Sequence, residues 1–363
     1  MKQKTLAVAV AAICGVVLTG CNDSDSDDWQ SIISNPTKTG NVLVLTDNNQ
    51  LASFDMNKPN DLISNEKITG LKNNDSLIGI DYRPADGKLY AVGSLGTIYT
   101  IDPSTNRAEL KSTLIADSAD TSAPYTEITG NPGLMSVDFN PAADRLRVIG
   151  NDGQNLRINV DTGATTTDGA LNGADATITS AAYTNSFAGT ATTRLFDIDV
   201  KADRVYLQNP PNDGTLAASA PLGVNAESSS GFDIDSNNNQ GYAILNVVNK
   251  QQFYKIDINK VTAADSANAA TLVGDLPSGI MSATIRGLAL KPAKDAGATI
   301  QGLSNNNQLV SFKLNKPNET NTVAITGLAS GETLMGIDYR LRTDVAGKSG
   351  VQQQMILRCL SLA

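Results

Sequence analysis

The chain has 363 residues, with 28 Lys and Arg against 37 Asp and Glu, so its formal net charge is −9. Such an acidic chain excludes nucleic acid as a partner, because neutralising phosphates needs clustered Lys and Arg. The sequence contains no histidine. That absence excludes Ser-His-Asp and Cys-His nucleophilic machinery and every zinc site that uses histidine.

Residues 1–20 are predicted to be a lipoprotein signal peptide. A short basic head precedes an uncharged apolar run from Leu6 to Val17, which is too short for a permanent membrane-spanning helix. The LTGC that follows, Leu18 to Cys21, resembles the bacterial lipobox. This resemblance implies cleavage before Cys21 and diacylation of its thiol. The alternative is an ordinary secretory signal with a chance cysteine.

Residues 21–40 contain the acidic, serine-rich NDSDSDDW and are predicted to be a flexible tether. Cys14 leaves with the signal and Cys21 carries lipid, so Cys359 alone cannot form an intramolecular disulfide. We therefore expect a cell-envelope protein that is held to a membrane by the lipid on Cys21. Asn22 is not the aspartate that typically retains lipoproteins in the inner membrane. The outer membrane is thus the expected location, with the protein facing the periplasm or the exterior.

Beyond residue 40, short runs of alternating apolar and polar residues recur between Gly, Asn, Asp and Pro, which predicts an all-β chain. One sequence motif, here called the first phrase, recurs as LIGIDYRP from Leu77, LMSVDFNP from Leu134, SSGFDID from Ser229 and IRGLALKP from Ile285. In one unit ITSAAYTNS from Ile178 takes its place. Further strand phrases follow, such as GKLYAVG from Gly87 and TIYTIDPSTN from Thr97. Repeats of several short strands predict a β-propeller, because neighbouring blades cover each other's apolar faces.

The spacing of these phrases predicts the number of blades. LIGIDYR begins at Leu77, and LMGIDYR follows 257 residues later at Leu334. Five first-phrase positions divide this distance into about 51 residues each, so we expect five blades, with six as the alternative. The phrase from Ile285 has no outer strands of its own, whereas residues 41–57 and 64–71 lack a first strand. We therefore expect the N-terminal strands to complete the last blade and close a propeller of residues 41–296.

Several long phrases occur in one order along the chain. They are GIDYRPADGKLYAVGSLGTIYTID, VDFNPAADRLRVIGNDGQNLRINVDTG, AAYTNS, LQNPPNDGTL and RGLALKP. Together they resemble the bacterial domain-of-unknown-function family 4394 over about residues 41–292, with a partial second copy to Arg340. The resemblance implies a β-propeller-like secreted or anchored domain. It implies no established activity, so no catalytic residue is carried over.

Asp81, Asp138 and Asp233 occupy the same place in their first phrases, and Arg286 lies near the corresponding place in the fifth. If the first phrase is the innermost strand, these four side chains face a central tunnel. Converging acids there would hold a polar ligand or a divalent cation such as calcium. The alternative is that each Asp accepts backbone hydrogen bonds at its strand end and repeats only because the blade repeats.

Two other groups of residues have both a functional and a structural interpretation. Arg145, Arg147 and Arg157 gather in the second blade and would bind a carboxylate or phosphate, or else form a solvated face or pair with Asp residues of the blade. NDGQN from Asn151 and NDGTL from Asn212 offer oxygens to calcium, but neither continues to a distal Glu. We expect tight turns at both places.

No residue pattern identifies a catalytic centre, and no resident cofactor is expected. We expect a non-enzymatic binding or scaffold module whose partner is an unknown protein or small molecule. The alternative is a hydrolase or lactonase that uses a divalent metal in the tunnel. In that case Asp81, Asp138 and Asp233 would supply metal ligands and a base.

Residues 297–340 are predicted to be a partial second propeller copy. TDNNQLASFDMNKPN from Thr46 returns as SNNNQLVSFKLNKPN from Ser304. After Arg340, however, the tail of residues 341–363 fits no strand phrase, whereas Arg83 is followed by PADGKLYAVG. We expect this aberrant tail to be disordered or poorly packed.

A frameshift in a two-domain ancestor explains the tail. An ancestral Pro-Ala-Asp-Gly-Arg coded CCT GCG GAC GGA CGT gives Leu-Arg-Thr-Asp-Val when it is read one base late, and that sequence stands at Leu341 to Val345. We predict that a single-base change near this point of the gene restores a propeller phrase downstream. The nucleotide sequence checks this, and a gene in which no nearby base change restores a strand phrase contradicts the frameshift.

Overall fold

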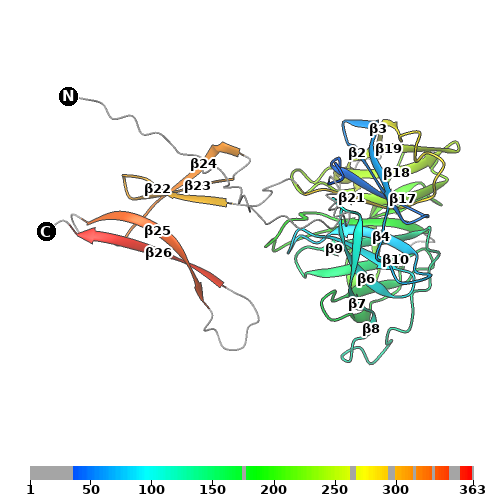
Figure 1. The fold of residues 1–363 in the computed structure, drawn as a ribbon, viewed down its shortest axis with the longest axis horizontal. Coiled ribbons are helices and arrows are strands. Elements are labelled where there is room, and N and C mark those ends of the chain that lie inside the picture. Colours follow the sequence, from blue (N-terminus) through cyan, green and yellow to red (C-terminus); the bar gives the residue numbers. More distant parts are fainter. Residues whose placement is uncertain are drawn as a thin grey trace, which may run out of the picture. The chain divides into compact units, whose positions relative to one another are not determined.

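The computed structural model describes residues 36–173, 177–261, 267–292, 299–313, 316–328, 332–342 and 352–361. Figure 1 shows that they form strands and connecting loops; the helical elements among them are two 3₁₀ turns, η1 (Pro211–Asp213) and η2 (Ile258–Val261). The predicted all-β class is confirmed. In the described part of the chain no helix is long and apolar enough to cross a membrane. The predicted signal peptide, Cys21 and most of the tether lie outside the described residues.

The described residues between 36 and 292 form five sheets, which we number in the order in which their first-phrase strands occur along the chain. The first sheet holds β4 (Leu77–Tyr82), β5 (Leu89–Gly93), β6 (Thr97–Asp102) and β7 (Arg107–Thr113). The second holds β9 (Met135–Asn140), β10 (Arg145–Gly150), β11 (Asn155–Ile158) and β12 (Ala164–Thr167), with β8 (Ile115–Ala116) parallel to β12 at its edge.

The third sheet holds β13 (Ile178–Tyr183), β14 (Leu195–Asp199), β15 (Arg204–Gln208) and β16 (Leu216–Pro221). The fourth holds β17 (Ser228–Ile234), β18 (Gly241–Val247), β19 (Lys250–Ile256) and β20 (Ala270–Asp275). The fifth holds β21 (Ile285–Leu290), β1 (Val42–Thr46), β2 (Gln50–Asp55) and β3 (Lys58–Lys67). Apart from β8, neighbouring strands in these sheets are antiparallel.

The first-phrase strands β4, β9, β13, β17 and β21 are here called the five central strands. Each contacts the central strand of the next sheet, and β21 of the fifth sheet contacts β4 of the first. The series of contacts therefore returns to its starting strand. Each central strand lies at one edge of its sheet. The other strands of that sheet pair one after another, in the order given above, toward the opposite edge.

The fifth sheet joins residues from both ends of this region. β1 pairs with β21 in antiparallel register, with Val42 opposite Leu290 and Val44 opposite Leu288. On its other side β1 pairs with β2. The prediction that N-terminal strands supply the outer part of the last sheet is confirmed.

Strand β1 is buried on both faces, as its sequence VLVLT requires. Leu43 and Leu45 belong to a core cluster with Ile80 and Leu89 of the first sheet. Val42 and Val44 point to the other face, into a cluster with residues of the fourth sheet. Because successive side chains of a strand alternate between faces, this one short strand contributes to two cores.

Hairpin turns carry polar residues in the left-handed conformation, which Asn and Asp tolerate better than other side chains. Asn49 between β1 and β2 has φ +55°, and its side-chain oxygen accepts a hydrogen bond from the Leu77 N–H at 2.9 Å. This bond ties the fifth sheet to the start of β4. The Asn-Asp-Gly turns at Gly153 and Gly214 have φ of +90° and +69°, so the expectation of tight turns there is confirmed.

The described residues between 299 and 361, where the sequence predicts a partial second copy and a tail, form two further sheets, which are described by themselves. One holds β22 (Thr299–Leu303), β23 (Gln308–Lys313) and β24 (Lys316–Ala324); the other holds β25 (Glu332–Arg342) and β26 (Gln352–Ser361). Asn307 has φ +55°, as Asn49 has, and its side-chain oxygen accepts the Leu334 N–H at 3.0 Å. The local geometry around Asn49 thus occurs a second time.

The tail differs from the sequence expectation in one respect. Residues 352–361 form strand β26 and pair along β25, although their sequence matches none of the strand phrases of residues 41–292. No counterpart of the GKLYAVG phrase, which forms the partner of β4, follows Arg340 in the sequence. The apolar MILRCL segment pairs with β25 instead. A two-stranded ribbon is only marginally stable by itself.

We predict that Leu51→Ala destabilises the protein more than the matched Leu309→Ala. Both leucines follow Asn-Asn-Gln, but Leu51 is 1% exposed in the core cluster shared with the first sheet, whereas Leu309 is half-buried. Removing a fully buried leucine costs about 2–5 kcal/mol of unfolding free energy. Urea unfolding followed by circular dichroism measures both variants, and equal losses would contradict the packing described for β2.

Candidate functional site

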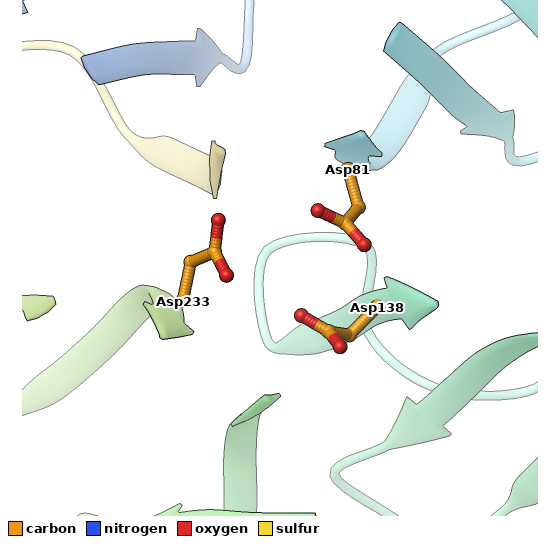
Figure 2. A group of neighbouring side chains, drawn as sticks. All are labelled: Asp81, Asp138 and Asp233. Atoms are coloured by element: carbon orange, nitrogen blue, oxygen red, sulfur yellow. The ribbon is translucent and has the colours of Figure 1, made fainter. Parts of the chain in front are cut away.

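The three repeated aspartates come together at the ends of central strands. Asp81, Asp138 and Asp233 lie on β4, β9 and β17 and are 3%, 3% and 5% exposed. One carboxylate oxygen from each lies within 4.8 Å of the others. Figure 2 shows the three carboxylates pointing toward one another from separate strands. The structure therefore assembles these three of the four residues that the sequence singled out.

The carboxylates of Asp81 and Asp233 each accept two backbone hydrogen bonds. Asp81 accepts the N–H of Tyr82 at 2.7 Å with Oδ1 and the N–H of Phe139 at 2.7 Å with Oδ2. Asp233 likewise accepts from the following residue with Oδ1 and from Leu290 with Oδ2, both at 2.6 Å. In each case the second donor belongs to the next central strand.

Asp138 makes the same connection with a single bond, in which its Oδ1 accepts the Tyr183 N–H at 3.0 Å. The acids thus link β4 to β9, β9 to β13 and β17 to β21. The other two central strands, β13 and β21, have Ala182 and Ala289 at the positions that correspond to the aspartates. These strands therefore have no carboxylate that could make this link. The interpretation that the aspartates accept backbone hydrogen bonds is confirmed. For each aspartate one of the N–H donors lies on the next central strand, which the sequence did not identify.

Burial dominates the electrostatics of the cluster. It raises the pKa of Asp81 and of Asp138 well above the usual range, and the charges of the neighbouring aspartates add to the increase. Burial raises the pKa of Asp233 to about 7, while the N–H groups of Leu290 and Ile234 partly oppose this. Three carboxyls this close cannot all ionise without a counter-charge. A shared proton or a cation with oxygen ligands, such as calcium, would both satisfy the group.

Arg286 lies apart from the three acids. Its Nη1 donates to Ser76 Oγ at 2.5 Å and to the Leu77 carbonyl at 3.1 Å, at the beginning of β4. Asp81 is four residues further along this strand, a distance of about 13 Å at the usual rise per residue. Ala289, rather than Arg286, holds the place in β21 that corresponds to the aspartates.

Two of the three arginines that the sequence singled out in the second sheet pair with the same aspartate. Arg147 is 2% exposed, and its Nη1 forms an ion pair with Asp168 at 2.8 Å and also donates to Asn155. Its Nε and Nη2 donate to Tyr183 and Asn212, respectively. Arg157 contacts the same Asp168 through two nitrogens. The expectation of Asp partners is confirmed for both arginines, whereas the Arg145 guanidinium donates to backbone carbonyls.

One buried acid was not singled out from the sequence. Asp197 on β14 is fully buried, and neither carboxylate oxygen has a hydrogen-bond partner among the described residues. Burial raises its pKa well above the usual range, and the positive charge of Arg147 partly opposes the increase. In the strand phrase LFDID, alternation places Asp197 on the face opposite Phe196 and Ile198, so the pattern does not predict its burial.

The axis of the five central strands is nearly filled. A cavity lined by all five strands has a volume of about 10 Å³, and a second one beside Asp81 and Asp233 is equally small. This is room for about one water molecule. Larger hollows lie elsewhere: one of about 430 Å³ beside Lys88 and Arg107, and one of about 480 Å³ beside Arg194 and Gln208.

A family model described as "Domain of unknown function (DUF4394)" matches residues 50–289. No curated protein matches the chain. Among solved structures, a structural genomics protein of unknown function from Bacteroides thetaiotaomicron is 12% identical, with 77% of this chain and 67% of that chain covered and a TM-score of 0.37. A nidogen/laminin complex is 9% identical, with 69% and 97% covered and a TM-score of 0.42. Scores this low define neither fold nor function.

Proposed function

The chain belongs to the family described as a domain of unknown function (DUF4394), and because this description names no reaction, we propose a function from the geometry of the structure. The protein is a non-enzymatic binding or scaffold module built on a β-propeller of five blades. The five sheets and the cyclic contacts of their central strands support this number of blades. The pairing of β1 with β21 supports closure of the ring by the N-terminal strands.

The size of the axial cavities is the observation that favours binding over catalysis. At about 10 Å³ each they admit one water and no organic substrate. The three acids beside them already accept backbone hydrogen bonds that join consecutive central strands. Ligand recognition is therefore assigned to the outer hollows and loops, which are large enough for a small molecule or a segment of a partner protein.

The cellular setting completes the proposal. The propeller of residues 41–296 is held by the tether of residues 21–40 to a lipid on Cys21, at the outer membrane facing the periplasm or the exterior. The partial second copy of residues 297–340 and the tail of residues 341–363 follow it. A lipid anchor and a tether let the module reach partners near the membrane surface while it remains attached.

A metal-dependent hydrolase or lactonase is the second candidate, and one observation favours it. The oxygens of Asp81, Asp138 and Asp233 lie close enough together to hold one divalent cation. A cation there would neutralise the buried charges and lower the pKa of a bound water. The carboxylates would then act as ligands, and one of them as a base.

The matched variants Asp81→Asn and Asp138→Asn test the proposal. An asparagine oxygen can still accept the single N–H that Asp138 binds, whereas Asp81→Asn loses one of two acceptors. We expect Asp81→Asn to lower the unfolding free energy by about 1–3 kcal/mol more than Asp138→Asn, since a buried donor is left unpaired. Urea unfolding of the full-length protein with and without EDTA measures this, with Asp102→Asn, at the exposed end of β6, as the control.

Metal content and turnover separate the two candidates. The binding module predicts no metal-dependent hydrolysis of ester, lactone or phosphoester substrates by the full-length protein. One retained equivalent of divalent metal per chain, lost in Asp138→Asn together with metal-dependent turnover, would contradict the non-enzymatic function and establish the hydrolase.

A further inference from the structure

Strand β22 has in its own sheet the place that β1 has in the fifth sheet. In the pair β1–β2, Val42 lies opposite Phe54. In the pair β22–β23, Ile300 lies opposite Phe312, which is the same register 258 residues later in the sequence. β22 also contacts β25, as β1 contacts β4. The sheet of β22, β23 and β24 therefore has the arrangement of β1, β2 and β3.

The two sheets differ at one edge. β1 pairs on its far side with β21, whereas β22 is the edge strand of its sheet. Among the described residues between 299 and 361, β23 is the strand that pairs with β22. The contact with β25 does not cover the edge, because β1 contacts β4 in the same way and still pairs with β21. The edge that β21 covers on β1 is therefore open on β22.

The open edge of β22 presents the backbone groups of two residues. The Ser304 N–H donates to the Gln308 carbonyl, so the backbone groups of Ser304 point toward β23. In an antiparallel ladder, alternate residues direct their N–H and C=O groups to the same neighbour. Gly302 therefore points toward β23, and Gln301 and Leu303 direct their N–H and C=O groups to the open edge.

This edge also has none of the features with which proteins protect an edge strand. Charged side chains, proline and β-bulges commonly block such edges. The sequence of β22, TIQGL, has no charged residue and no proline, and its register with β23 is regular. Ile300 is 37% exposed, so part of the apolar surface of the strand is also uncovered. A further strand can therefore pair with β22.

We propose that β22 is a docking edge that takes an antiparallel strand with the sequence pattern of β21 from a second polypeptide. The register of β1 with β21 defines the fit. Transferred to β22, this register places Leu288 of such a strand opposite Gly302, and Gly287 opposite Leu303. In each pair a leucine faces a glycine, so the side chain of one strand lies over the backbone of the other.

The docking strand comes from outside this chain. β21 of this chain, or of a further copy of it, is already paired with β1. No counterpart of the phrase IRGLALKP follows Ile300 in the sequence. The partner is therefore another protein of the same family, in which a strand of this pattern has no N-terminal strand beside it. Backbone hydrogen bonds to β22 supply affinity, and the alternate side chains supply specificity. The edge lies outside the five sheets, so it is independent of the function proposed for them.

A synthetic peptide with the sequence of residues 284–292, TIRGLALKP, tests the edge on the full-length protein. We expect the labelled peptide to bind saturably in fluorescence anisotropy and to slow hydrogen exchange of the amides of Gln301 and Leu303. N-methylation at Ala289 removes the N–H that donates to the edge, and should weaken binding at least about tenfold. N-methylation at Leu288 is the matched control, since that N–H points away from β22.

Gln301→Pro and Gln301→Ala make the same comparison on the protein. Proline removes an N–H that points to the open edge, and an edge strand tolerates proline at such a position. We expect Gln301→Pro to bind the peptide at least about tenfold more weakly than Gln301→Ala, in which this N–H is retained. Should Gln301→Pro fail to fold, the two N-methylated peptides still decide the matter.

Three results would overturn the proposal. The first is no saturable binding, or equal binding of the two N-methylated peptides. The second is a peptide that alters exchange in β1 and leaves β22 unchanged, because it would then compete for β21 or its surroundings. The third is a dimer in analytical ultracentrifugation that forms without peptide and is lost in Gln301→Pro, because a second copy of this chain would then occupy the edge.

Discussion

The pairing of β1 with β21 is the contact on which the rest of the domain depends. Without it the fifth sheet would be the single strand Ile285–Leu290, and two core clusters would lose the side chains of Val42 to Leu45. The strand brings together residues about 250 positions apart in sequence. Closing so long a loop costs only slightly more entropy than closing a shorter one. The burial of β1 on both faces opposes that cost.

The central strands approach one another closely because small residues line their contacts. A Cβ atom on Gly79 would lie 2.4 Å from Cγ2 of Val137, and one on Gly231 would lie 2.6 Å from Cβ of Leu288. Such contacts leave no space for a larger side chain. The same closeness lets Asp81, Asp138 and Asp233 reach the backbone of the next strand. It also leaves an axis of water-sized cavities, which is why organic ligands are assigned to the outer hollows.

The sequence predicted the features that follow from repetition. Strand phrases with period-two alternation indicated an all-β chain. Because no outer-strand phrases follow the phrase from Ile285, the sequence also indicated that the N-terminal strands complete that sheet. The equal placement of Asp81, Asp138 and Asp233 predicted that they converge. Their N–H donors were not predictable, because these lie on a neighbouring strand and depend on how closely the sheets pack. The strand at residues 352–361 was missed because its sequence resembles none of the strand phrases of residues 41–292.

Arg286 and Asp197 show a second limit of sequence reasoning. A β-bulge in β21 moves Arg286 out of the alternation, and the bulge arises from pairing with β1 rather than from any local signal. Asp197 looks like an ordinary strand residue until its inward face is known to be fully buried. In both cases tertiary pairing decides the environment of a charge, so composition and spacing alone do not identify it.

Amide hydrogen exchange of the full-length protein tests the account most directly. Since β1 is a middle strand of the fifth sheet, its amides at Val42 to Thr46 should exchange as slowly as those of β4 and β21, through opening of the whole domain. Amides of β1 that exchange orders of magnitude faster than those of β4, while β21 stays protected, would contradict closure of the domain by its N-terminal strand.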